Sequence, residues 1–147
     1  MELTDALSFA RGQSKGVLTT IKRDGRPQLS NIVYVMAGAD GDRDHDVARI
    51  SVTDSRAKTK NLRRDPRASL YVVGESFWAY VVLEGVVELS EVAHAPDDEV
   101  VEELVWMYRS ASGEEHPDWD EFRRAMVEEG RLVVRFRPER AYGMVRE

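Results

Sequence analysis

A succession of short strand-like segments joined by tight turns is the feature that most restricts the fold of this chain. The pair Asp24-Gly25 lies between two such segments, Gly16–Lys22 and Pro27–Met36, and both residues tolerate the positive φ angles of a hairpin turn. Further strands are expected at Val47–Thr53, Ala68–Val73, Phe77–Leu89 and Leu132–Phe136. Because neighbouring strands joined by tight turns pair antiparallel, these six strands predict an antiparallel sheet that closes into a small barrel.

Three stretches carry apolar residues at helical spacing and predict helices that flank the sheet. The first lies at the N-terminus, where Thr4 is the expected N-cap and Gly12 the expected stop. The other two stripes are Val100, Val101, Leu104, Val105 and Tyr108, followed by Trp119, Phe122 and Met126. The length of 147 residues suits one domain, residues 1–147. The expected class is therefore mainly β with flanking helices.

The composition excludes several classes of function. The chain has no cysteine, so disulfides, thiolate catalysis and cysteine-bound metals are excluded. No apolar stretch approaches the roughly 20 residues that a membrane helix requires, and the N-terminus lacks the pattern of a secretory signal. The net charge of −6 argues against general binding to nucleic acids or anionic membranes. A cytoplasmic protein without nucleic-acid or membrane partners is expected.

The segment Ser55–Arg64 carries five cations and no acid, a local charge of +5 on an acidic chain. It follows a strand, and Asp54 or Ser55 could cap a helix that starts there. A helix N-terminus presents unpaired backbone N–H groups to an anion, Arg56 can grip a phosphate with two parallel bonds, and Lys58 adds a point charge. Alone, such a run is more often a solvated helix face. Because charges this dense repel each other, a compact anionic ligand would explain their presence.

Two other segments carry side chains suited to a flat ligand. Pro27 stiffens the start of its strand, while Gln28 and Ser30 project to one side and can hydrogen-bond the edge of a heterocycle. Trp78 and Tyr80 are expected on one face of a strand, where they could wall a planar ring or fill a subunit interface. Taken alone, an ordinary surface hairpin and ordinary core aromatics explain these patterns better.

No motif supplies a catalytic group or a metal site. Residues 40–46 resemble the start of a calcium loop, but His45 stands where the EF-hand glycine belongs and no glutamate closes the loop. The three histidines, His45, His94 and His116, lack metal-ligand spacing, and no Rossmann, Walker or nucleophile-elbow pattern is present. We therefore expect no metal and no catalytic residue from the protein itself, with a cofactor performing any chemistry.

Several blocks of sequence, in this order and at these separations, resemble the deazaflavin-dependent branch of the pyridoxamine 5′-phosphate oxidase-like proteins. They are Gly16–Thr20, Asp24–Asn31 and Ser55–Ala68, continued by Trp78, Tyr80, Glu84-Gly85 and Tyr142–Met144. The resemblance covers nearly the whole chain. It implies an FMN-binding split barrel, that is, a six-stranded antiparallel split β-barrel, which forms a homodimer with two cofactor sites at the subunit interface.

The resemblance also implies a cofactor and its ligands. Coenzyme F420 would bind by its phosphodiester- and carboxylate-bearing tail to Arg56, Lys58 and Asn61. The deazaflavin ring would lie near Pro27, Gln28 and Ser30 and near Ser51, and Trp78 and Tyr80 match aromatics that approach the site, with the partner subunit as one source. The implied reaction passes a hydride from the reduced deazaflavin to a conjugated small molecule, such as a biliverdin-like tetrapyrrole. The polar loop 38–46 is a candidate border of the acceptor pocket.

Two alternatives stay open at the level of sequence. An FMN enzyme of the pyridoxamine 5′-phosphate oxidase type is one, because the same basic segment could hold the FMN phosphate. A non-catalytic protein that stores a cofactor or a tetrapyrrole is the other, since no protein acid or base is evident.

Overall fold

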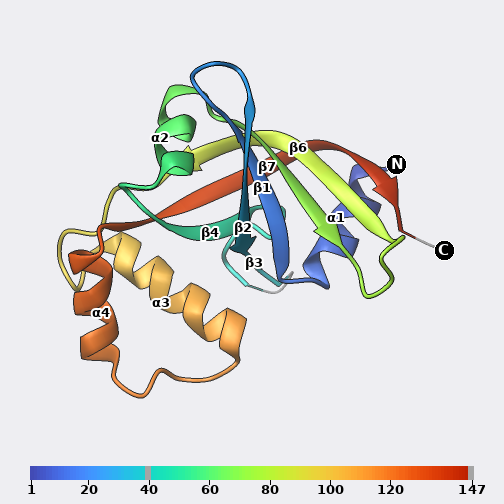
Figure 1. Ribbon diagram of the computed structural model, residues 1–147. Helices are drawn as coiled ribbons and strands as arrows, with labels where there is room; N and C mark the ends of the chain where they lie inside the picture. Colours follow the sequence, from blue (N-terminus) through green and yellow to red (C-terminus); the bar gives the residue numbers. More distant parts are fainter. Residues whose placement is uncertain (39–40, 146–147) are drawn as a thin grey trace.

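The computed structural model describes residues 1–38 and 41–145, which form a curled antiparallel sheet with helices around it (Figure 1). The helices are α1 (Leu3–Arg11), α2 (Ala57–Arg64), α3 (Glu99–Ser112) and α4 (Trp119–Glu128). The strands are β1 (Lys15–Ile21), β2 (Pro27–Val33), β3 (Val35–Met36), β4 (Ala48–Thr53), β5 (Arg67–Val73), β6 (Tyr80–Leu89) and β7 (Arg131–Met144). Their order across the sheet is β2-β1-β5-β6-β7-β4-β3, and every neighbouring pair is antiparallel. The predicted class, mainly β with flanking helices in a split barrel, is confirmed.

The two edge strands of the sheet are consecutive in the chain, and this curls the sheet on itself. Only Tyr34 separates the end of β2 from the start of β3, although these strands lie at opposite ends of the strand order. Its backbone N–H donates to the carbonyl of Ser14 at 2.9 Å, and its buried hydroxyl donates to the carbonyl of Ala10 at 2.6 Å. The sequence predicted six strands because the alternation of residues 27–36 continues through Tyr34. The described sheet has seven, because the chain changes edges at that residue.

β7 is the longest strand and holds the two halves of the sheet together. Its first half pairs with β4, and it pairs with β6 from Leu89 to Tyr80. The sequence predicted a strand of only five residues here, ending at Phe136, with the rest as a tail. A bulge at Glu84/Gly85 interrupts the β6–β7 register, and a Cβ at Gly85 would clash with the carbonyl oxygen of Arg137. A glycine is therefore required at this close approach.

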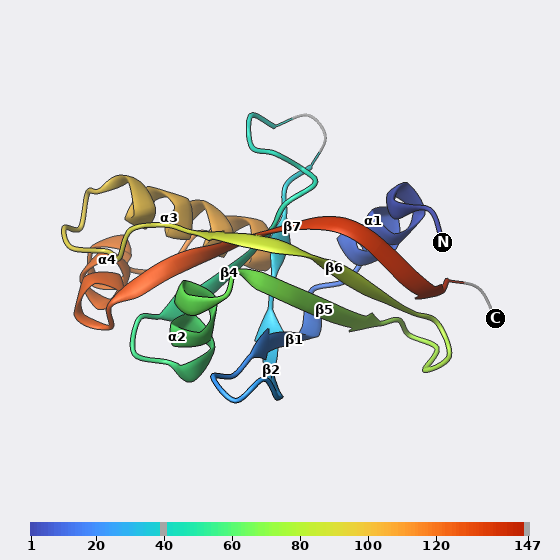
Figure 2. The same ribbon diagram turned by 90° about the horizontal axis from the view of Figure 1, so that it is seen from above.

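α3 and α4 lie together beside one end of the sheet, and α1 lies at the other end (Figures 1 and 2). α3 begins at an N-cap, Asp98, whose carboxylate accepts the backbone N–H of Val101 at 2.9 Å. A buried carboxylate, Glu103, then joins α3 to two strands. It accepts from Arg49 of β4 at 2.9 Å and from Arg135 of β7 at 2.6 Å. This ion pair network fixes α3 against the sheet.

One of the predicted helix caps is confirmed and the others are wrong. Gly12 follows α1 as expected, but Glu2 rather than Thr4 occupies the N-cap position. α2 has Arg56 at its N-cap position, and neither Asp54 nor Ser55 caps it.

No helix among the described residues is long and apolar enough to cross a membrane. The cytoplasmic location stays a prediction.

Candidate functional site

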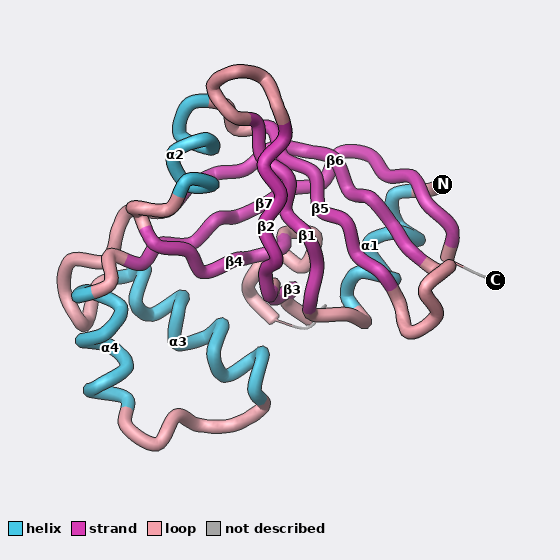
Figure 3. Tube along the Cα trace, viewed as in Figure 1, coloured by secondary structure: helices cyan, strands magenta, loops and turns pink. Residues whose placement is uncertain are grey.

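α2 packs beside the β1–β2 hairpin (Figure 3). A buried asparagine, Asn61, joins the two. The Nδ2 group of Asn61 donates to Thr20 Oγ1 at 3.1 Å and to Gln28 Oε1 at 3.2 Å. Its Oδ1 accepts from Arg64 at 3.0 Å, and only 7% of the residue is exposed. Two of the predicted site residues, Asn61 and Gln28, are therefore hydrogen-bonded to each other.

The N-terminal end of α2 carries two cations, Arg56 and Lys58, next to the turn that leads into the helix. The buried hydroxyl of Thr59 donates to the carbonyl of Thr53 at 2.8 Å and so fixes the turn that leads into the helix. Arg63 pairs with Asp54 at 2.7 Å. Within residues 1–38 and 41–145, Arg56 and Lys58 have no such pair, and Arg56 is exposed at the N-cap position. This end of α2 is electropositive and open to an anion.

Lys58 is half-buried, and its surroundings disfavour its charge. Burial, followed by the neighbouring cations Arg56 and Arg131, lowers the pKa of Lys58 below its ordinary value. Arg131, the first residue of β7, also donates to the hydroxyl of Ser51 at 3.4 Å. Arg56, Lys58 and Arg131 thus lie close together, and of these three Arg131 is paired with an acid, Glu129, at 3.0 Å. An anionic group bound among them would relieve their repulsion.

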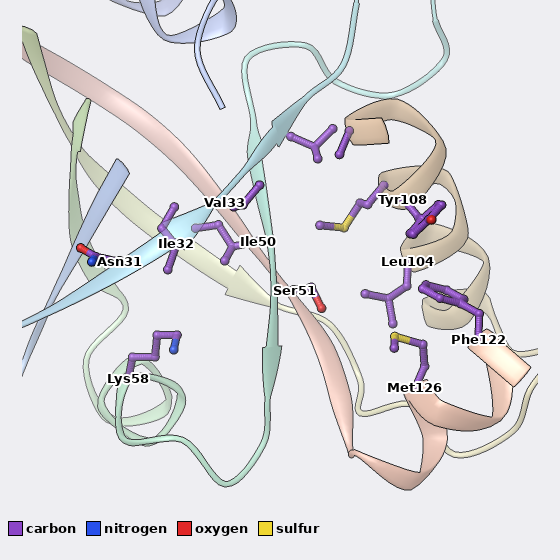
Figure 4. A pocket seen from close by; sticks show the side chains of 13 residues that line it. Asn31, Ile32, Val33, Ile50, Ser51, Lys58, Leu104, Tyr108, Phe122 and Met126 are labelled. Carbon is purple, nitrogen blue, oxygen red and sulfur yellow. The ribbon is translucent and has the colours of Figure 1, made fainter. Parts of the chain in front are cut away.

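A cavity of about 370 Å³ lies between the sheet and the helices α3 and α4 (Figure 4). We call it the α3–α4 cavity. Its polar lining comes from Asn31, Ser51 and Lys58, on three different elements. Its apolar lining comes from Ile32, Val33, Val35 and Ile50 on the sheet and from Leu104, Met107, Tyr108, Ala111, Phe122 and Met126 on the helices. The helical side chains face the sheet across the hollow in Figure 4.

A second hollow, of about 430 Å³, adjoins the first along β2. Residues 31–33 line both hollows, and the second is otherwise lined by Lys15–Val17, Tyr71 and Val73. β2 is an edge strand, so its last residues form a ridge between the two spaces. The α3–α4 cavity therefore lies next to the outer surface of the sheet.

The structure brings some of the predicted residues together and leaves others apart. Ser51 and Lys58 line the same cavity, and Gln28 contacts α2 through Asn61. Pro27 and Ser30 lie on β2, but neither lines the α3–α4 cavity. The arrangement thus has two centres, the α2–hairpin junction and the cavity beyond it.

Trp78 and Tyr80 lie far from α2 in the same chain. The expected strand from Phe77 begins only at Tyr80, because Gly74 N–H donates to the carbonyl of Ala79 at 2.7 Å and closes a turn. Trp78 sits in this turn, 71% exposed, with its ring 5.0 Å from that of Phe77. The prediction that Trp78 and Tyr80 share a strand face is wrong, and the turn lies at the end of β5 remote from α2 (Figure 1).

Sequence reasoning missed the helical wall of the cavity. Tyr108, Phe122 and Met126 were predicted as stripes of amphipathic helices, and a stripe does not distinguish a packed core from a cavity wall. Asn31 and Arg131 gave no separate signal. In the loop 38–46, residues 39 and 40 lie outside the described residues, and in its described part Asp44 accepts from Arg137 at 2.6 Å. None of the described loop residues lines the α3–α4 cavity.

Comparison with known proteins identifies the fold family. The chain matches the pyridoxamine 5′-phosphate oxidase family over residues 4–144. Among solved structures, an F420 reductase is 22% identical with a TM-score of 0.63, covering 92% of this chain and 94% of that one. A conserved hypothetical protein from Mycobacterium tuberculosis is 24% identical with a TM-score of 0.69, covering 96% and 82%.

A heme storage protein from Vibrio cholerae is 16% identical with a TM-score of 0.65, covering 97% of this chain and 95% of that one. At these identities the likeness to solved structures establishes the fold alone. The family match spans nearly the entire sequence, and the curled seven-stranded sheet agrees with it. The chain therefore belongs to the pyridoxamine 5′-phosphate oxidase family.

Proposed function

We propose that this protein is an oxidoreductase that uses coenzyme F420 to reduce a conjugated, unsaturated small molecule. The observation that carries the proposal is that Ser51 and Lys58, singled out on different segments, line one cavity beside an electropositive helix end. The family binds flavin-type cofactors, and one similar structure is an F420 reductase. A flavin-type cofactor needs both an anion site and a space for a flat ring, and the chain offers the two side by side.

The residues at the N-terminal end of α2 fit an anionic tail. Arg56 is exposed and Lys58 is half-buried, and neither has an acid partner in the described part of the chain. Charge-assisted hydrogen bonds from these groups would hold a phosphodiester, whereas Arg131 is already paired with Glu129 at 3.0 Å. Asn61 would support the site without contacting the tail, because its amide is already hydrogen-bonded inside the protein.

The chain would orient the reactants rather than supply a catalytic group. Gln28 and Ser30 on β2 and Ser51 on β4 would position the edge of the ring, and the apolar lining of the α3–α4 cavity would exclude water. When bound, the cofactor supplies the hydride. Trp78 and Tyr80 would reach a site only from a second subunit, which accords with the homodimer that we also propose.

A binding titration with F420, FMN and NADPH tests the proposal. We expect F420 to bind most tightly. Replacing Arg56 or Lys58 by alanine should weaken its binding by roughly tenfold each, since each change removes a charge-assisted hydrogen bond. Arg124→Ala, which removes an exposed cation from α4, is the control and should bind F420 normally. Unchanged F420 affinity in the Arg56→Ala/Lys58→Ala double variant would contradict the assignment.

The same titration separates the two rival functions. Tighter binding of FMN than of F420, with a yellow purified protein, would favour an FMN-dependent oxidase. Two similar structures are heme storage or heme-binding proteins, so heme belongs in the panel. Binding of F420 or heme without turnover across many unsaturated acceptors would favour a non-catalytic binding protein.

A further inference from the structure

The α3–α4 cavity is polar at one end and apolar at the other. Lys58 and Asn31 lie on the side of α2 and β2, whereas Phe122 and Met126 lie on the helical side, and Ile50 and Ser51 lie between these two groups (Figure 4). The ring expected near Ser51 would fill the space between Ser51 and Lys58, on the polar side of the cavity. The apolar end is then the space that faces the ring, where an acceptor must lie to receive a hydride.

The cavity carries a single charged group. Lys58 is the one Lys, Arg, Asp or Glu side chain in its lining, and no carboxylate lines it within the described residues. The acids of α3 nearest to this wall are occupied elsewhere, because Glu103 pairs with two arginines and Glu102 pairs with Arg123 at 2.6 Å. A cationic molecule would therefore lose its hydration at this site without gaining a carboxylate partner, and aromatic ring faces would compensate for this loss only in part.

The helical wall is built from side chains that suit flat, apolar molecules. Met107 and Met126 offer polarisable thioethers, which adapt to irregular shapes and pack well on aromatic rings. Tyr108 and Phe122 meet edge to face, with centroids 5.5 Å apart, and present ring surfaces to the hollow. The volume of about 370 Å³ lies near the lower end of the range for small-molecule sites, roughly 300–1,000 Å³.

We propose that the apolar end of the α3–α4 cavity binds the acceptor, and that it selects a compact, flat, apolar molecule that is neutral or singly negative rather than positively charged. Extended acceptors such as linear tetrapyrroles and all cationic acceptors are disfavoured. Met126 and Phe122 determine this selectivity from the helical side. The inference rests on the proposed function, because it assumes that the polar end receives the ring.

Three probes of similar size and different charge test this selectivity on the purified protein without cofactor. They are menadione, which is neutral, naphthoate, an anion, and N-methylquinolinium, a cation. Binding is followed by calorimetry and by quenching of tryptophan fluorescence. We expect menadione and naphthoate to bind and N-methylquinolinium to bind at least roughly tenfold more weakly, because a cation lacks a charged partner there.

Two variants change the charge of the cavity from opposite ends. Met126→Glu places a carboxylate in the apolar wall, so it should weaken naphthoate and strengthen N-methylquinolinium by roughly tenfold. Lys58→Met should weaken naphthoate and leave menadione unchanged. The control Arg124→Glu adds a carboxylate to an exposed position of the same helix and should change none of the three affinities. A gain in cation binding cannot arise from a misfolded variant.

The results distinguish a failure of this inference from a failure of the proposed function. Two results would overturn the inference. One is equal affinity of the wild-type protein for the three probes, and the other is that Met126→Glu leaves the three affinities unchanged. F420 binding is measured separately on the same samples. A protein that binds no F420 contradicts the proposed function, whereas an F420-binding protein whose cavity shows no preference for charge contradicts this inference alone.

Discussion

At the scale of single residues, Asn61 shows what sequence can predict about a site and what it cannot. The resemblance to the deazaflavin-dependent proteins predicts Asn61 as a ligand of the cofactor's tail. The sequence could not reveal that its amide is used inside the protein, because Thr20 and Gln28 come from a hairpin more than thirty residues earlier. The structure therefore favours a positioning role, in which Asn61 holds Gln28 at a fixed distance from α2.

Replacing Asn61 by alanine tests this role. We expect the affinities for F420 and for a deazaflavin that lacks the anionic tail to fall by similar factors, roughly tenfold, because Gln28 loses its orientation. A residue that touched the tail itself would affect F420 alone. The control is Thr20→Val, which removes the hydroxyl but keeps the hydrogen bond between Asn61 and Gln28. Calorimetric titration of both ligands decides between the two roles.

At the scale of helices and strands, periodicity predicted most elements but not their neighbours. The stripes of α3 and α4 were confirmed as helices, and the hairpin at Asp24-Gly25 was confirmed as β1 and β2. Which elements these helices and strands pack or pair with depends on contacts between segments that are distant in the sequence. The second half of β7 was missed because Arg137, Glu139 and Arg140 interrupt its apolar alternation, although β6 pairs with it to Met144. The ion pairs of Glu103 were likewise not predicted, because the sequence does not distinguish Glu103 from the other glutamates of α3.

Glu103 fixes α3, and hence the cavity wall, against the sheet. Glu103→Gln should lower the free energy of unfolding by about 3–5 kcal/mol at pH 7, because it leaves Arg49 and Arg135 without their buried partner. Glu102→Gln is the control. Its carboxylate is 54% exposed and pairs with Arg123, so its loss should cost about 1 kcal/mol or less. Urea denaturation of the three proteins measures both differences.

The same ion pair network predicts a dependence on pH. Burial alone would raise the pKa of Glu103, but the hydrogen bonds and charges of Arg135 and Arg49 outweigh it and hold the pKa below its usual value. A carboxyl group with a lowered pKa in the folded state stabilises the protein above its unfolded pKa, about 4.3, and loses this contribution as the pH falls further. The difference between wild type and Glu103→Gln should therefore shrink below about pH 4. A constant difference down to pH 2.5 would contradict this assignment.

At the scale of the whole molecule, the curled sheet leaves one broad face uncovered. The strand register aligns Asn31, Val17, Tyr71, Val82 and Tyr142 in a row across five strands. Exposed apolar side chains flank this row, among them Leu29 (64% exposed), Val33 (53%) and Met144 (54%). Monomeric proteins seldom expose a continuous apolar patch of this kind. The ridge at residues 31–33 joins this face to the α3–α4 cavity, so a partner on the face would also border the site.

We therefore expect the chain to be a homodimer through this face. Light scattering after size-exclusion chromatography should give the wild type a molar mass of twice 16.7 kDa, the mass of one chain. Tyr142→Asp places a charge at the β7 end of the buried row, so it should yield monomers and also weaken F420 binding, because the site would lose its second wall. Arg124→Asp, on the exposed side of α4, should stay dimeric. A monomeric wild type at tens of micromolar, or a dimer that tolerates Tyr142→Asp, would place the uncovered face outside any subunit interface, and Trp78 and Tyr80 would then have no route to the site.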